Sequence, residues 1–168
     1  MEVPDNLFLE WETYPPVTEA ELYDAERVLG YRLPETYRAV LRVQNGGLLR
    51  RCFYPTEKTT AWVSSFFGVG PHAGYHSGGL DREFSDGKTL NQQLIETWSY
   101  PQGIVICHQG HAGYILDYAS CGPNGDPRVL YAMAECLPRV EITEVAPSFA
   151  VFLAGLTEFD QDGKSNWT

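Results

Sequence analysis

The chain has 168 residues, 43% of them hydrophobic and 20% charged, which predicts one globular domain with a core that needs neither disulfides nor metal. No segment approaches the roughly 20 apolar residues that span a bilayer, and the start lacks the cationic region of a secretory signal, so we expect a cytoplasmic protein without membrane contact. The net charge of −10 repels phosphates and argues against direct nucleic-acid binding.

The acidity is concentrated at the N-terminus. Residues 1–26 contain eight carboxylates and no basic side chain, whereas residues 27–168 contain 14 acids and 12 bases. Such a surface attracts basic partners through long-range electrostatics, but a charged run can also be a solvated face without a partner. Both interpretations stay open from the sequence.

The first 17 residues contain three prolines, which exclude a long helix. We expect this acidic segment to pack on the domain through its apolar side chains, which are Leu7, Phe8, Leu9 and Trp11.

Two short helices are predicted next. Residues Thr18-Glu19-Ala20-Glu21 have the pattern of a capping box, and Gly30 supplies a left-handed stop. Pro34 suits the first position of the second helix, which Asn45-Gly46-Gly47 ends. The connection between the helices is so short that we expect them to pack as a hairpin.

The pattern then changes to strands. Residues 48–54 and 61–69 predict two of them, residues 70–88 form a long glycine-rich loop, and Thr89–Trp98 predicts a third helix. Three further strands, at residues 104–107, 113–118 and 129–133, precede a closing helix that directs Phe149, Phe152, Leu153 and Leu156 inward. This order predicts an α+β domain with a mainly antiparallel or mixed sheet, flanked by the N-terminal helix hairpin and the C-terminal helix.

Patterns of catalytic or metal-binding residues are weak. Cys107 and His108 are neighbours on a predicted strand and would point to opposite faces, and no pair with zinc-finger spacing accompanies them. The irregularly spaced Cys52, Cys107, Cys121 and Cys136 are expected to be reduced thiols. We therefore predict no enzyme activity, no metal and no cofactor.

An ordered series of short motifs begins at the second predicted helix. Leu33-Pro34-Glu35-Thr36-Tyr37 is followed by Ala39-Val40-Leu41 and by Asn45-Gly46-Gly47. Downstream come residues 101–106, 113–117, 127–131 and 148–153. Together they resemble the SUKH superfamily, of the Smi/Knr type, whose central strands and closing helix the downstream motifs match.

The resemblance implies a single SUKH-like domain without enzymatic activity. Most bacterial members look like immunity proteins that bind and block a toxin, often a nuclease, and a eukaryotic branch takes part in regulating cell-wall assembly. The first reading predicts a cognate toxin domain as partner, expected to be basic; the alternative is an intracellular regulatory or interaction protein. The sequence predicts no oligomeric state. The residues expected to build the scaffold are Leu33, Pro34, Tyr37, Leu41, Asn45, Gly46, Gly47, Gly113 and Asp117.

The family motifs leave the acidic start and the glycine-rich loop unexplained. We divide the chain into an acidic segment at 1–17, a SUKH-like domain at 18–157 and a polar tail at 158–168. The residues predicted to contact a partner are Glu19, Glu21, Asp24, Glu26, His72, Tyr75 and His76.

Overall fold

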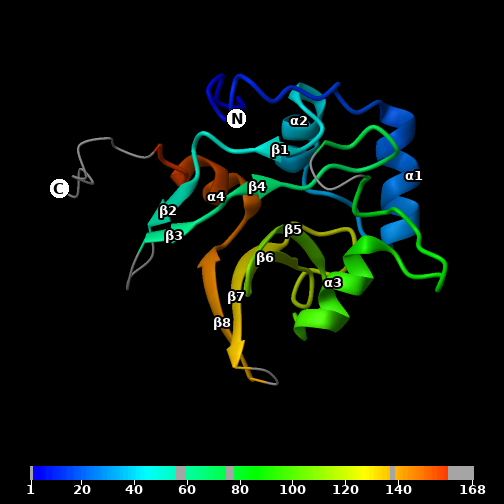
Figure 1. Cartoon of the computed structure of the whole chain (residues 1–168), viewed down its shortest axis with the longest axis vertical. Helices are drawn as coiled ribbons and strands as arrows, with labels where there is room; N and C mark the ends of the chain where they lie inside the picture. The colour runs from blue at the N-terminus through cyan, green and yellow to red at the C-terminus, as the bar shows by residue number, and fades with distance from the viewer. Residues whose placement is uncertain (1, 56–59, 75–77, 137–138, 159–168) are drawn as a thin grey trace.

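The computed structural model describes residues 2–55, 60–74, 78–136 and 139–158, which form four helices and eight strands (Figure 1). The helices are α1 (Glu19–Leu29), α2 (Glu35–Val43), α3 (Leu90–Trp98) and α4 (Phe149–Gly155). The strands are β1 (Gly47–Leu48), β2 (Phe53–Pro55), β3 (Thr60–Trp62), β4 (Ser65–Phe66), β5 (Ile104–Gln109), β6 (Ala112–Asp117), β7 (Arg128–Cys136) and β8 (Arg139–Ala146). The predicted α+β class is confirmed.

Helix α1 begins and ends where the sequence predicts. The Thr18 hydroxyl accepts a hydrogen bond from the Glu21 backbone N–H, and the Glu21 carboxylate accepts one from the Thr18 N–H, which completes the capping box. Gly30 stops the helix with a φ of 76°.

Helix α2 differs from the prediction at its first residue. Pro34 precedes the helix instead of occupying its first position, because its ψ of 141° is extended. At the other end Gly46 has a φ of 85°, and a Cβ built there would lie 2.6 Å from the Gly68 backbone N. Glycine is therefore required at position 46 both for the turn and for the close approach of the 66–68 segment.

The strands form three antiparallel sheets. The largest has the order β5-β6-β7-β8, while β1 pairs with β4 and β2 pairs with β3. The two long strands predicted at 48–54 and 61–69 are wrong in length, since the chain there forms β1 to β4 with irregular segments between them. Strand β8 was not predicted. Its outer face is polar, so a search for apolar runs passes over it, although Val140 and Ile142 alternate with polar residues at the period of a strand.

Aromatic side chains of α4 join the helices to the large sheet. The Phe149 ring lies 4.9 Å from that of Tyr37 on α2, and the Phe152 ring lies 5.3 Å from that of Tyr114 on β6. The predicted inward residues of this helix are all buried. Leu7 and Phe8 also reach the core, whereas Trp11, expected to pack against the domain, is exposed.

Candidate protein-binding surfaces

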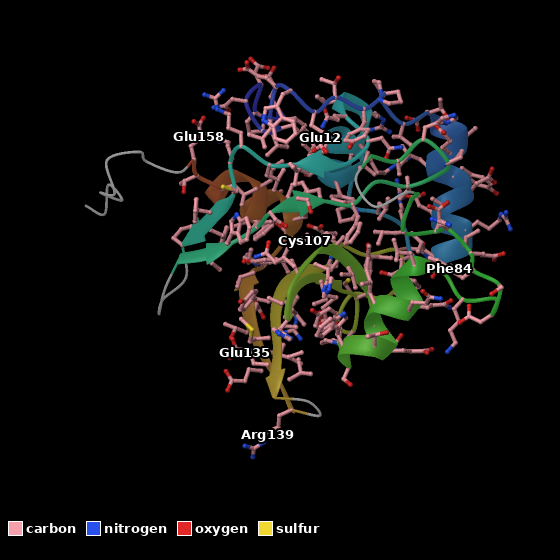
Figure 2. All side chains as sticks on the ribbon, viewed as in Figure 1. Glu12, Phe84, Cys107, Glu135, Arg139 and Glu158 are labelled. Atoms are coloured by element: carbon pink, nitrogen blue, oxygen red, sulfur yellow. The ribbon has the colours of Figure 1, made fainter. Side chains whose placement is uncertain are left out.

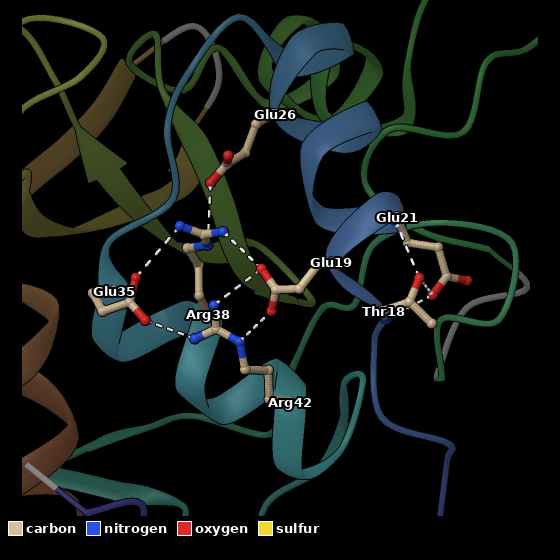
Figure 3. A network of polar contacts seen from close by, with 7 residues as sticks. All are labelled: Thr18, Glu19, Glu21, Glu26, Glu35, Arg38 and Arg42. Atoms are coloured by element: carbon tan, nitrogen blue, oxygen red, sulfur yellow. Dashed lines mark hydrogen bonds and ion pairs between the residues drawn. The ribbon is translucent and has the colours of Figure 1, made fainter.

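Ion pairs connect α1 to α2 (Figure 3). Arg42 donates from Nε to Glu19 Oε1 at 2.6 Å and from Nη1 to Glu35 Oε1 at 2.6 Å. Arg38 lies 3.2 Å from a Glu19 oxygen and 3.7 Å from a Glu26 oxygen. Two guanidinium groups of α2 thus hold two carboxylates of α1 and one of α2.

This network uses two of the predicted contact residues within the fold. The hydrogen bond from Arg42 lowers the pKa of the Glu19 carboxyl, and the bonds to both carboxylates raise the pKa of Arg42. The Glu26 side chain is largely buried and also accepts a hydrogen bond from the Leu33 backbone N–H at 2.9 Å. Glu26 was predicted to contact a partner, which would need an exposed side chain. Its side chain turns inward, where the carboxylate accepts the hydrogen bond from the backbone of the connection between the two helices.

Glu21 and His72, distant in sequence, are brought together. His72 Nδ1 lies 2.9 Å from Glu21 Oε1, with the imidazole exposed and the carboxylate largely buried. The hydrogen bond from His72, followed by those from Thr18, lowers the pKa of Glu21 to about 2. Glu21 is therefore charged at neutral pH, and it connects the start of α1 to the glycine-rich loop.

The outward face of α1 presents Asp24 and Tyr23. The Asp24 side chain is 68% exposed and its nearest cation, Arg27, lies 3.8 Å away. Tyr23 is 69% exposed and lines a shallow hollow of about 320 Å³. The hollow is lined also by Tyr31, Arg27, Arg32 and Asn124, among others. Tyr and Arg are the side chains enriched at protein interfaces, so this hollow suits a protein partner better than a buried ligand.

Part of the glycine-rich loop packs firmly on the domain. The Asn45 side chain donates to the Val69 carbonyl at 2.8 Å and accepts from the Val69 N–H at 3.0 Å. Its amide thus makes the same two hydrogen bonds with Val69 that a peptide group of a neighbouring strand would make. Leu80 is fully buried, and Gly70 N–H donates to Asp81 at 2.8 Å. Tyr75 and His76 lie outside the described residues, and their contact role stays a prediction.

The other motif residues have contacts that build the scaffold. The Tyr37 hydroxyl donates to the Phe67 carbonyl at 2.6 Å. Asp117 accepts from the Ala119 N–H at 3.0 Å and from Arg128 Nε at 2.8 Å, so it closes the turn after β6. A Cβ on Gly113 would lie 2.6 Å from the Tyr100 ring. Side chains of Leu33 and Leu41 are buried in the core, and Pro34, Gly46 and Gly47 are also buried.

Cys107 and His108 have different surroundings. Burial raises the pKa of the Cys107 thiol, which lies against Ser64. His108 lies against the Trp98 ring, with centroids 4.9 Å apart. In the part of the chain that the structure describes, no group of three His, Cys, Asp or Glu side chains could hold a metal ion. Nor is any described helix long and apolar enough to cross a membrane.

Sequence reasoning missed the acidic residues of the β7–β8 hairpin. Glu135, Glu141 and Glu144 are exposed there, and Ile142 is 51% exposed between the last two. Figure 2 shows Glu135 and Arg139 near the end of the hairpin, which extends away from the helices. The alternation of polar and apolar residues along β8 is the signal that would have found this surface.

One comparison with known proteins identifies a family. The model of the SMI1 / KNR4 family (SUKH-1) matches residues 16–155, which is most of the chain. The search of curated proteins with this chain found no match. The matched range includes the capping box of α1, the Asn45-Gly46-Gly47 junction, the large sheet and α4.

Proposed function

Since the chain belongs to the SMI1 / KNR4 family (SUKH-1), we propose that it is a non-catalytic, cytoplasmic protein-binding module. More specifically, we propose an immunity protein that binds a basic toxin domain and neutralises it. The observation that carries this proposal is the family match over residues 16–155. The protonated, buried Cys107 thiol supports the non-catalytic part, because a thiol nucleophile needs a lowered pKa.

The outward face of α1 is the proposed approach surface for the toxin. Among the described members of the predicted contact set, the side chains of Glu19, Asp24 and His72 are exposed, at 64%, 68% and 70%, and Tyr23 adds an aromatic anchor beside the hollow. We propose that Glu19, Glu21 and Glu26 act indirectly, by holding α1 against α2 and the loop. Charges at the rim of an interface mainly speed association, so this face would steer the partner.

The test is protection of cells. The proposal predicts a toxin gene beside this one. Its toxin domain should arrest growth when expressed alone, and co-expression of this protein should restore growth. The two purified proteins should form a complex of fixed stoichiometry. A soluble, folded immunity protein that neither binds the toxin nor restores growth would contradict the proposal.

The same purified protein can distinguish the alternative function. Affinity purification from the native cell should recover the toxin domain under the immunity proposal. Recovery of cell-wall assembly components, without toxin, would favour an interaction protein of the regulatory kind.

A further inference from the structure

Strand β8 forms an open edge of the large sheet. The order β5-β6-β7-β8 leaves β5 and β8 at its two edges, and Phe67 N–H donates to the Ile106 carbonyl of β5 at 2.9 Å. On β8 the Tyr54 hydroxyl donates to the Val145 carbonyl at 3.0 Å, near the C-terminal end of the strand. No other described residue outside the sheet bonds to the β8 backbone. Edge strands of this kind present unpaired N–H and C=O groups that can accept another strand.

The middle of β8 is regular and acidic. Residues 141–144 pair with residues 133–130 of β7 without interruption, and register shifts lie on both sides of this stretch. Because side chains alternate between the faces of a sheet, Glu141 and Thr143 share one face, while Ile142 and Glu144 share the other. Each face therefore carries one carboxylate. The Glu144 carboxylate already pairs with Arg128 at 2.9 Å, whereas the Glu141 side chain is exposed and has no ion-pair partner among the described residues. The exposed Ile142 adds an apolar contact.

We propose that the β8 edge between residues 140 and 145 is a docking strand for an extended segment of the toxin that carries Lys or Arg side chains. This inference rests on the proposed function and names the part of the toxin that the protein would bind. Main-chain hydrogen bonds would hold the segment, and a basic side chain opposite Glu141 would select it.

Charge argues against a second copy of the chain as the occupant. Residues 140–145 carry Glu141 and Glu144 and no basic side chain, so pairing of this stretch with its own copy would place two acidic strands side by side in a chain whose net charge is −10. Like charges on facing strands oppose pairing, so the acidic residues protect this edge from self-association and still admit a basic strand.

Hydrogen–deuterium exchange on the complex tests the inference. The probe is the toxin domain that the growth test identifies, in a variant that no longer arrests growth, added to the full chain. We expect amides within 140–145 to exchange at least about tenfold more slowly in the complex, because new strand pairing protects alternate N–H groups.

A matched pair of variants separates docking from general charge effects. Ile142→Lys places a cation against the basic segment and should weaken toxin binding by about tenfold or more. Val151→Lys on α4 is the control, because Val151 is 48% exposed, close to the 51% of Ile142. It should change the affinity by less than about twofold. Circular dichroism of both variants should match that of the parent, since neither side chain is buried.

The outcomes distinguish the inference from the proposed function. Toxin binding without protection of 140–145, or with Ile142→Lys as tight as the parent, overturns the docking strand and leaves the immunity proposal standing. Absence of binding together with absence of growth protection overturns both. A dimer of this chain alone with protected β8 amides would overturn the choice of a basic partner.

Discussion

Helix α1 and strand β8 are both acidic, but their carboxylates differ in what they contact. On α1, Glu19, Glu21 and Glu26 bind groups of their own chain. On β8, Glu144 pairs with Arg128 at 2.9 Å, whereas the side chain of Glu141 makes no ion pair with any described residue. The density of charge in a sequence therefore overstates what a partner can meet. The excess is larger at α1, where three of the four carboxylates accept hydrogen bonds from their own chain, than at β8, where one of the two is ion-paired.

The two regions also differ in backbone chemistry. The peptide groups of α1 are satisfied within the helix and by its caps, so a partner meets only side chains there. The edge of β8 offers peptide groups as well. We therefore assign electrostatic steering of the partner to α1 and strand docking of the partner to β8. The following variants test this assignment.

The largest expected effect is on the free energy of unfolding, and it should differ clearly between α1 and β8. Leu22→Ala on α1 removes a fully buried side chain and should lower the free energy of unfolding by about 2–5 kcal/mol. Ile142→Ala on β8 should change it by less than about 0.5 kcal/mol, because the side chain is half exposed. Urea denaturation measures both. Equal losses would mean that β8 is as deeply involved in the core as α1.

A smaller effect is expected from the ion pairs. Arg42→Ala removes the nearer of the two arginines that pair with Glu19 and Glu35 and should destabilise the fold by about 1 kcal/mol at low salt, with a smaller loss at high salt. Arg139→Ala is the control on β8, since Arg139 is exposed and makes no ion pair among the described residues. Thermal unfolding at two salt concentrations measures both. A salt-independent loss for Arg42→Ala would show that packing, not charge, connects the helices.

The smallest effect concerns acid pH. The folded pKa of Glu21, about 2, lies below its ordinary value of 4.5, so its stabilising contribution is present above pH 4.5 and is lost as the pH falls toward 2. Glu21→Gln keeps a capping-box acceptor and removes the charge, so its stability should fall less steeply across that range. Glu141→Gln is the matched control and should keep the parent slope. Denaturation curves at several acid pH values decide between them.

Local chemistry made much of the scaffold predictable. The capping box at Thr18, the stop at Gly30 and the inward face of α4 depend on residues close in sequence, and all three are confirmed. Contacts between side chains that are far apart in the sequence could not be predicted. The amide of Asn45 bonds to Val69 and the guanidinium of Arg42 to Glu19 only because the fold brings these segments together. The candidate surfaces depended on this second kind of contact, so the sequence located the acidic residues without showing which ones were already bound.

The kinetics of toxin binding by two charge-reversal variants test the central claim most directly. Asp24→Lys and Glu141→Lys make the same change in charge at exposed carboxylates of α1 and β8. Steering by α1 predicts that Asp24→Lys slows association by a factor of about three, with this effect lost at high salt and dissociation unchanged. Docking at β8 predicts that Glu141→Lys speeds dissociation by about tenfold or more. Faster dissociation for Asp24→Lys, with Glu141→Lys unchanged, would contradict the account and place the contact on α1.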